Sequence, residues 1–212
     1  MPSPHTLTPM PTSAGRPAAP KWQRSRLASH RVSEATTPGA SPLRDDGRLR
    51  GLRARLDDLH ARGRLEPVAV EPHLVGDGLH LAALNFRRAA RHLDDPDVAI
   101  VFLYQSVVNT ADTVLHCLGY HARDYEGHKL AIALTADLVD ALSGRSRSRL
   151  MASTSERLRR RRHEALYTRP GVMTAADVRA TLEDCRAFLP RLWAMAGRVV
   201  GMPAPAEAAA VA

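Results

Sequence analysis

The stretch DVAIVFLYQSVVNTADTVLHCL, residues 97 to 118, decides the fold of this chain. Apolar and small residues recur in it at the i, i+3, i+4 and i+7 spacing of one helix face, and Ile100, Tyr104 and Val108 add a second apolar surface. A helix that is apolar on more than one face lies in the centre of a fold or at a dimer interface. Gly119 follows where a helix C-cap residue is expected. The stretch therefore predicts a long central helix.

Helical spacing of apolar residues recurs on both sides of this stretch. It predicts helices over residues 74–92, 128–142 and 148–167, and a fifth helix that begins at Thr174 and runs through Ala196. Thr174 and Asp177 have the spacing of a capping box, and Pro190 is expected to kink the fifth helix. No alternating strand pattern of useful length is present. We expect an all-α fold, an up-and-down bundle of four to five helices behind a disordered N-terminal arm.

Composition divides the chain into four parts. Residues 1–47 are expected to form a disordered, basic, Pro-rich arm, because prolines from Pro2 to Pro42 interrupt every potential helix. Residues 48–72 are expected to form a short amphipathic helix and a linker, with leucines at helical spacing that need a partner surface. Residues 73–200 are expected to form the helical domain. Residues 201–212, rich in Pro and Ala, are expected to be a disordered tail.

The formal net charge of +8 and the isoelectric point near 10.4 are typical of a protein with a polyanionic partner. Nearly every basic residue is Arg, however, with Lys21 and Lys129 as the two lysines, and the chain is rich in Ala and Pro. A GC-rich genome produces the same bias without selection for binding. The charge is therefore a moderate indication of nucleic-acid binding.

Apolar segments and cysteine spacing bear on the cellular location. No run approaches the roughly 20 apolar residues that span a bilayer, and the first residues lack the apolar core of a secretory signal. Cys117 and Cys185 are isolated within helical patterns, which favours reduced thiols over a disulfide or zinc site. His116, His121 and His128 are spread across a loop without a close carboxylate pair, so we expect surface histidines and no metal. These features predict a cytoplasmic protein without membrane contact.

The predicted helix over 148–167 carries an arginine run. Its inward stripe consists of Leu150, Thr154, Leu158, Ala165 and Leu166. Continued along the helix, this stripe includes Arg161 and Arg162, so both are predicted to face inward. Arg159 and Arg160 are predicted to face solvent. An inward arginine needs acceptors, because an unpaired buried guanidinium costs several kcal/mol. The candidate acceptors are Asn109, Asp112, Asp137 and Asp140.

Two interpretations of the inward arginines remain open. In the structural one, an arginine ties helices together through a bidentate carboxylate pair. In the functional one, it faces a cleft and meets a phosphate. His128, near the start of a predicted helix, is a further candidate for phosphate contact.

Several motifs occur together in a characteristic order. A small-apolar helical stretch ends in Gly119-Tyr120, His128-Lys129-Leu130 opens a Leu-rich helix, and Arg162 stands five residues before Tyr167, ahead of a Phe- and Leu-containing helix. Over about residues 74 to 198 this order resembles a HEPN domain (higher eukaryotes and prokaryotes nucleotide-binding), most closely the actinobacterial SAV-like branch. The resemblance implies a bundle of four to five helices that commonly forms a homodimer.

The resemblance also implies a function. Many HEPN domains are metal-independent RNA endonucleases of toxin, defence or tRNA-cleaving systems, so RNA is the expected partner, beside a protein partner such as an antitoxin or a nucleotidyltransferase. No cofactor is expected. The family's catalytic pattern, Arg, four to six residues, then His, corresponds to Arg157 and His163. The arginine would stabilise the phosphate charge and the histidine would transfer a proton, with the ribose 2′-OH as nucleophile.

Non-catalytic members keep an Arg before a Tyr, which Arg162 and Tyr167 match. Arg161, Arg162, Tyr167 and His128 are therefore the predicted RNA- or nucleotide-binding residues. The alternative function is a non-catalytic, dimerising protein-interaction module in which the arginines are structural.

Overall fold

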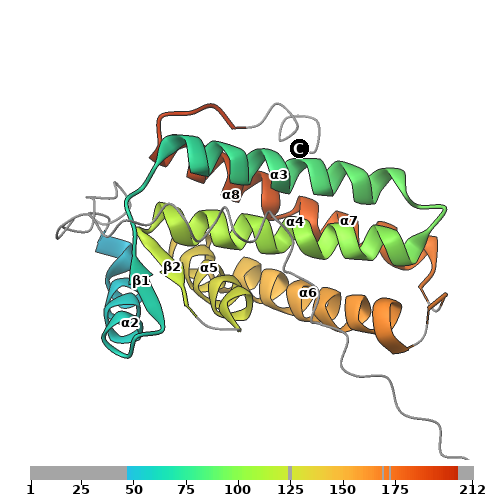
Figure 1. Cartoon of the computed structure of the whole chain (residues 1–212), viewed down its shortest axis with the longest axis horizontal. Helices are drawn as coiled ribbons and strands as arrows, with labels where there is room; N and C mark the ends of the chain where they lie inside the picture. The colour runs from blue at the N-terminus through green and yellow to red at the C-terminus, as the bar shows by residue number, and fades with distance from the viewer. Residues whose placement is uncertain (1–46, 124–125, 169, 172, 205–212) are drawn as a thin grey trace, which may run out of the picture. The chain divides into compact units, whose positions relative to one another are not determined.

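The structure is a computed structural model, and it describes residues 47–123, 126–168, 170–171 and 173–204 (Figure 1). The predicted arm up to residue 46 and the predicted tail from residue 205 lie outside these residues. The helices are η2 (Gly47–Leu49), α2 (Arg50–Ala61), α3 (Pro72–Arg91), α4 (Pro96–Cys117), α5 (Gly127–Ser143), α6 (Arg145–His163), η3 (Glu164–Thr168), α7 (Ala175–Arg186) and α8 (Leu189–Val199). The all-α bundle is confirmed.

Helix α4 is the central element, as its two apolar faces predict. It lies between α3 and the pair α5 and α6, and it also contacts α7 and α8 (Figure 1). Asp95 caps its start by accepting a hydrogen bond from the Val98 amide, and Gly119 follows its end at φ +83°. By length and composition α4 could cross a membrane, but 61% of its most apolar window is buried inside the bundle. Such burial is typical of a core helix.

Helices α3 and α4 pack closely because small residues face one another. Gly78 of α3 lies against Thr113 of α4, where a side chain on residue 78 would overlap the threonine hydroxyl. Ser106 Oγ donates a 2.8 Å hydrogen bond to the carbonyl oxygen of Ala82. The pair therefore depends on a close backbone approach at residue 78.

Helix α8 is held to the centre of the core by Trp193. Its indole Nε1 donates a 2.9 Å hydrogen bond to Thr110 Oγ1 of α4, and its ring is nearly perpendicular to that of Phe86, with 6.0 Å between the ring centroids. Pro190 lies in the first turn of α8, so the chain breaks into α7 and α8. The expectation of a single kinked helix was wrong, because the chain leaves helical geometry at Phe188 and Pro190 starts a new helix.

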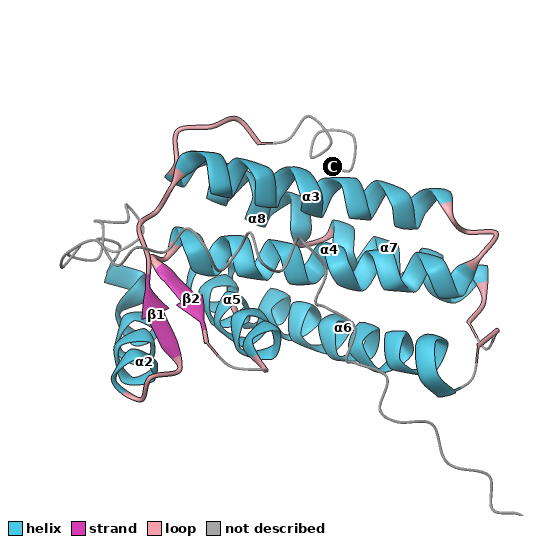
Figure 2. Cartoon of the chain, in the orientation of Figure 1, coloured by secondary structure: helices cyan, strands magenta, loops and turns pink. Residues whose placement is uncertain are grey.

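A small antiparallel sheet joins distant segments (Figure 2). Strand β1 (Leu65–Pro67) pairs with β2 (Tyr120–Ala122), with Leu65 opposite Ala122. The sequence predicted no strand, because three residues are too few to produce an alternation. Leu49, Leu52, Leu56 and Leu65 are buried in the same core as α3 to α8. Within the described part, the predicted amphipathic helix finds its partner surface in the bundle itself.

Candidate functional site

The arginines of α6 divide as the helical spacing predicts. Arg161 and Arg162 are half-buried, whereas Arg159 and Arg160 are exposed. Leu166 was predicted to face inward, but it is 46% exposed. The reason is a change of helical repeat, because residues 164–168 form a π-turn whose wider spacing shifts the stripe after Ala165.

Arg162 lies over an aromatic ring. Its guanidinium carbon is 5.3 Å from the centroid of the Tyr104 ring on α4, a cation–π contact. Among the described residues no carboxylate forms an ion pair with Arg162. A half-buried arginine is thus held in one place with its hydrogen-bond donors uncommitted.

None of the four predicted acceptors pairs with an inward arginine, and three of them are engaged elsewhere, which corrects that expectation. Asp112 pairs with His128, Asp137 pairs with Arg55 of α2, and Asn109 Oδ1 accepts a hydrogen bond from Gln105. Within the described part Asp140 forms no ion pair. Helix spacing alone does not fix which residues of a neighbouring helix lie opposite, and here a tyrosine lies opposite Arg162.

His128 stands in the first turn of α5, as predicted, and its Nδ1 lies 3.0 Å from Asp112 Oδ2. The hydrogen bond to Asp112 raises the pKa of His128 above its usual range, against smaller opposing effects of burial and of the Arg162 charge. With Nδ1 on Asp112, Nε2 is left for another partner, and the side chain is 61% exposed. His128 therefore stays protonated to a higher pH than an ordinary histidine does.

Tyr104, Asp112, His128 and Arg162 share one electrostatic neighbourhood, here called the Arg162 site. Burial raises the pKa of Tyr104, while the charges of Arg162 and Arg159 act against this rise and Asp112 adds to it. A pocket of about 180 Å³ adjoins Tyr104 between α4, α5 and α6, with Lys129 and Arg159 on its lining. Two arginines, a lysine and a histidine with a raised pKa therefore lie around Tyr104, and Glu156 on the same lining pairs with Arg159.

The two predicted catalytic residues do not come together within one chain. Arg157 forms an ion pair with Asp184 of α7, and His163 is exposed. They are six residues apart on α6, which is about 9 Å along the axis of a helix. No interaction joins them in the part of the chain that the structure describes. The Arg157–Asp184 pair joins α6 to α7 through one guanidinium nitrogen, and both side chains are partly exposed.

His163 lies beside the exposed Tyr167, which is 70% exposed, with 5.3 Å between the ring centroids. Arg161, by contrast, pairs with Glu164 of the next turn at 3.0 Å. The end of α6 thus presents two adjacent rings beside charged side chains.

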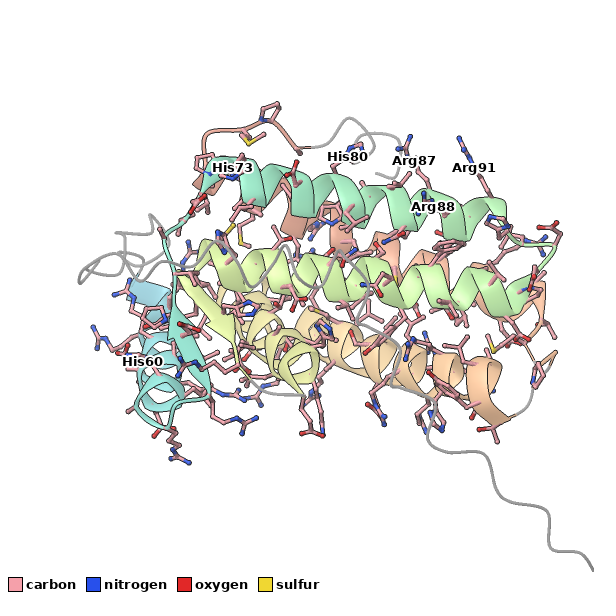
Figure 3. All side chains as sticks on the ribbon, in the orientation of Figure 1. His60, His73, His80, Arg87, Arg88 and Arg91 are labelled. Carbon is pink, nitrogen blue, oxygen red and sulfur yellow. The ribbon has the colours of Figure 1, made fainter. Side chains whose placement is uncertain are left out.

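A separate group of basic side chains lies on the outer face of α3. Figure 3 shows His80, Arg87 and Arg91 pointing away from the bundle. Arg88 instead lies over the Phe102 ring, 5.5 Å from its centroid. Arg91 is an exposed arginine on a different helix from the Arg162 site, and it provides a matched control for charge.

The thiols and histidines do not form a reactive or metal site within the described residues, where no group of three or more His, Cys, Asp or Glu side chains could hold an ion. Cys117 and Cys185 are buried, and burial raises the pKa of Cys117 to about 12. Burial raises the pKa of Cys185 as well. Neither thiol is a nucleophile near neutral pH.

Tyr104 and Asp184 are the residues of this region that sequence reasoning missed. Tyr104 was assigned to an apolar surface of the central helix, and Asp184 was not considered as a partner. One signal was present for Tyr104, since a tyrosine on a core helix needs a polar neighbour for its hydroxyl.

Comparison with known protein families, with curated proteins and with solved structures finds no match for this chain.

Proposed function

We propose that this chain is a HEPN-like helical module that binds RNA or nucleotide phosphate at the Arg162 site. The observation that carries the proposal is the position of Arg162, half-buried on Tyr104 and without a carboxylate partner among the described residues. A guanidinium fork that lies on a ring and has no carboxylate partner can receive an incoming anion. A cytoplasmic, dimeric protein is part of the same proposal.

A phosphate at this site would have two kinds of donor. The Arg162 fork can give two parallel N–H bonds to phosphate oxygens. Protonated His128 can add a donor from Nε2, since Nδ1 is turned to Asp112. Tyr104 fixes the guanidinium plane, so less side-chain freedom is lost on binding.

Bases would stack beyond the phosphate, on the exposed rings of Tyr167 and His163. Stacking of one base on an aromatic side chain contributes about 1–3 kcal/mol and tolerates any base. We therefore expect single-stranded RNA to bind with little sequence preference, with Arg161 adding charge beside the rings.

Cleavage is the extension of this proposal. In a metal-independent endoribonuclease of this kind, Arg157 would stabilise the phosphate charge and His163 would transfer the proton. Because Arg157 is paired with Asp184 and does not contact His163, the two would have to come from different copies of the chain. A second copy is thus required for the enzymatic version.

The alternative is a non-catalytic dimerising module with structural arginines. The Arg157–Asp184 ion pair between α6 and α7 favours it. It predicts that Arg162→Ala lowers the melting temperature while RNA affinity stays the same, whereas the RNA-binding proposal predicts weaker binding.

The experiment is fluorescence anisotropy of a labelled single-stranded RNA with Arg162→Ala and the control Arg91→Ala. We expect Arg162→Ala to weaken binding about tenfold, which corresponds to about 1.4 kcal/mol, and Arg91→Ala to change it little. Equal effects of both variants would show that RNA binding responds to net charge alone.

Cleavage is tested separately by incubating RNA with the protein in EDTA, with His163→Ala as the control. Intact RNA at high protein concentration would remove the enzymatic version and leave the binding proposal standing.

A further inference from the structure

A second pocket, of about 380 Å³, lies where η2, the end of α5, the start of α6 and α8 meet. Its floor is apolar, because the lining includes the buried side chains of Leu138, Phe188, Leu192 and Met195. Its residues are different from those of the Arg162 site. We call it the arginine-rimmed pocket.

The charged lining of this pocket is entirely basic within the part of the chain that the structure describes. Arg48, Arg147, Arg191 and Arg198 line it, and no Asp or Glu does. Arg147, Arg191 and Arg198 form no ion pair with a described carboxylate. On the same helix α6, Arg157, Arg159 and Arg161 each have such a partner.

The local sequence explains how the rim arises. Arg191, Ala194 and Arg198 stand at i, i+3 and i+7 on α8, which places both arginines on one face with a small residue between them. Arg147 lies in the first turn of α6, where no acidic residue is present and Gly144 provides no side-chain cap. A cation is unfavourable at a helix N-terminus, and a bound anion would offset this repulsion.

We propose that the arginine-rimmed pocket binds an anionic amphiphile, a molecule with one carboxylate or phosphate head on a short apolar chain. The chain would cover the apolar floor, and the head would meet the arginine forks, whose geometry matches both groups. The volume is within the range of roughly 300–1,000 Å³ that is usual for small-molecule sites.

Both halves of the ligand are needed to satisfy this pocket. A neutral apolar ligand would leave the repulsion among the arginines in place. Inorganic phosphate or a nucleic-acid backbone would neutralise the rim but leave the more exposed apolar lining, at Leu142, Ala187 and Ala194, against water. The combination of an apolar floor with a wholly basic rim therefore selects an amphiphile over either simpler class.

The test is isothermal titration calorimetry of the full chain with decanoate and decyl phosphate, each below the concentration at which it aggregates. Decanol and inorganic phosphate serve as the matched half-ligands. We expect both anionic amphiphiles to bind, and each half-ligand to bind at least about tenfold more weakly, equivalent to about 1.4 kcal/mol. Equal binding of decanol, or equal binding of phosphate, would overturn the proposal.

Two variants localise the site. Arg191→Gln with Arg198→Gln should weaken decanoate at least about tenfold, whereas Arg91→Gln, on the outer face of α3, should leave it unchanged. Ala194→Trp should block binding by filling the pocket, and circular dichroism checks that this variant is folded. Binding that survives both changes would place the ligand elsewhere and refute the proposal.

Vesicle co-sedimentation distinguishes the source of the ligand. Retention on phosphatidylglycerol vesicles that depends on Arg191 and Arg198 would assign a membrane lipid. Binding of decanoate without vesicle retention would assign a free acid. RNA anisotropy with the Arg191 and Arg198 variant should match the unmodified chain, which keeps this site separate from the Arg162 site.

Discussion

Nδ1 of His128, in the first turn of α5, lies 3.0 Å from Oδ2 of Asp112 on α4, and this hydrogen bond is the main reason why the pKa of His128 is raised above 6.5. We predict that Asp112→Asn lowers the pKa of His128, as measured by NMR titration of the imidazole. Asp140→Asn removes an exposed carboxylate from α5, the helix that carries His128, and should not lower the pKa of His128. A His128 pKa unaltered in Asp112→Asn would contradict the pairing.

The pair also predicts a pH dependence of stability. The pKa is higher in the folded than in the unfolded chain, so its stabilisation is complete below about pH 6.5 and is lost as pH rises through the folded value. His128 is 61% exposed, and solvent screening limits the effect to about 0.5 kcal/mol. In urea unfolding, the stability lost in Asp112→Asn should be larger by this amount at pH 5.5 than at pH 8.5; comparing the two chains at each pH cancels the opposite contribution of His116, whose pKa is lowered by burial.

Tyr104 and Arg162 should be energetically coupled. A cation–π contact in a partly desolvated position contributes about 0.5–1 kcal/mol. A double-mutant cycle with Tyr104→Leu and Arg162→Gln, measured by urea unfolding, should give a coupling of this size. Tyr104→Phe keeps the ring and should retain most of it. Additive effects of the two substitutions would show that the ring does not hold the guanidinium.

The sequence predicted the parts of the fold that local spacing determines. The central helix, its glycine end, the capping box of Thr174 and Asp177, and the inward turn of Arg162 each depend on residues within a few turns of one helix. The capping box is complete in the structure, with both hydrogen bonds formed. Local periodicity contains this information because a helix repeats every 3.6 residues.

The partners of these residues could not be predicted in the same way. Arg162 meets Tyr104 and Arg157 meets Asp184 because of how α6 is rotated against α4 and α7, and no local pattern records that rotation. Leu166 was placed on the wrong face because the π-turn breaks the helical repeat. The strands at Leu65 and Tyr120 were missed because each contains three residues and pairs across more than fifty positions of sequence.

Arg157 should contribute to the stability of the fold and not to RNA binding. Its ion pair with Asp184 joins α6 to α7, and both side chains are partly exposed, so the pair contributes at most about 1 kcal/mol. We predict that Arg157→Ala and Asp184→Ala each lower the free energy of unfolding modestly, that the double variant adds less than their sum, and that RNA affinity is unchanged. RNA affinity that falls in Arg157→Ala but not in Asp184→Ala would instead assign Arg157 to the interface with RNA.

Gly78 should tolerate no side chain unless Thr113 is also changed. A Cβ on residue 78 of α3 would overlap Oγ1 of Thr113, and Thr113 is held by a 2.7 Å hydrogen bond from that oxygen to the carbonyl of Asn109. Overpacking of this kind costs about 1–3 kcal/mol, which outweighs the gain of less than about 1 kcal/mol from replacing a helical Gly by Ala. Gly78→Ala should therefore destabilise the chain in urea unfolding, and Thr113→Ala should recover most of the loss by removing the hydroxyl.

Gly51→Ala is the matched control, because a Cβ at residue 51 of α2 meets nothing within 4 Å. This substitution should stabilise the fold or leave its stability unchanged. If Gly78→Ala behaved like Gly51→Ala, the close approach of α3 and α4 at this point would be refuted.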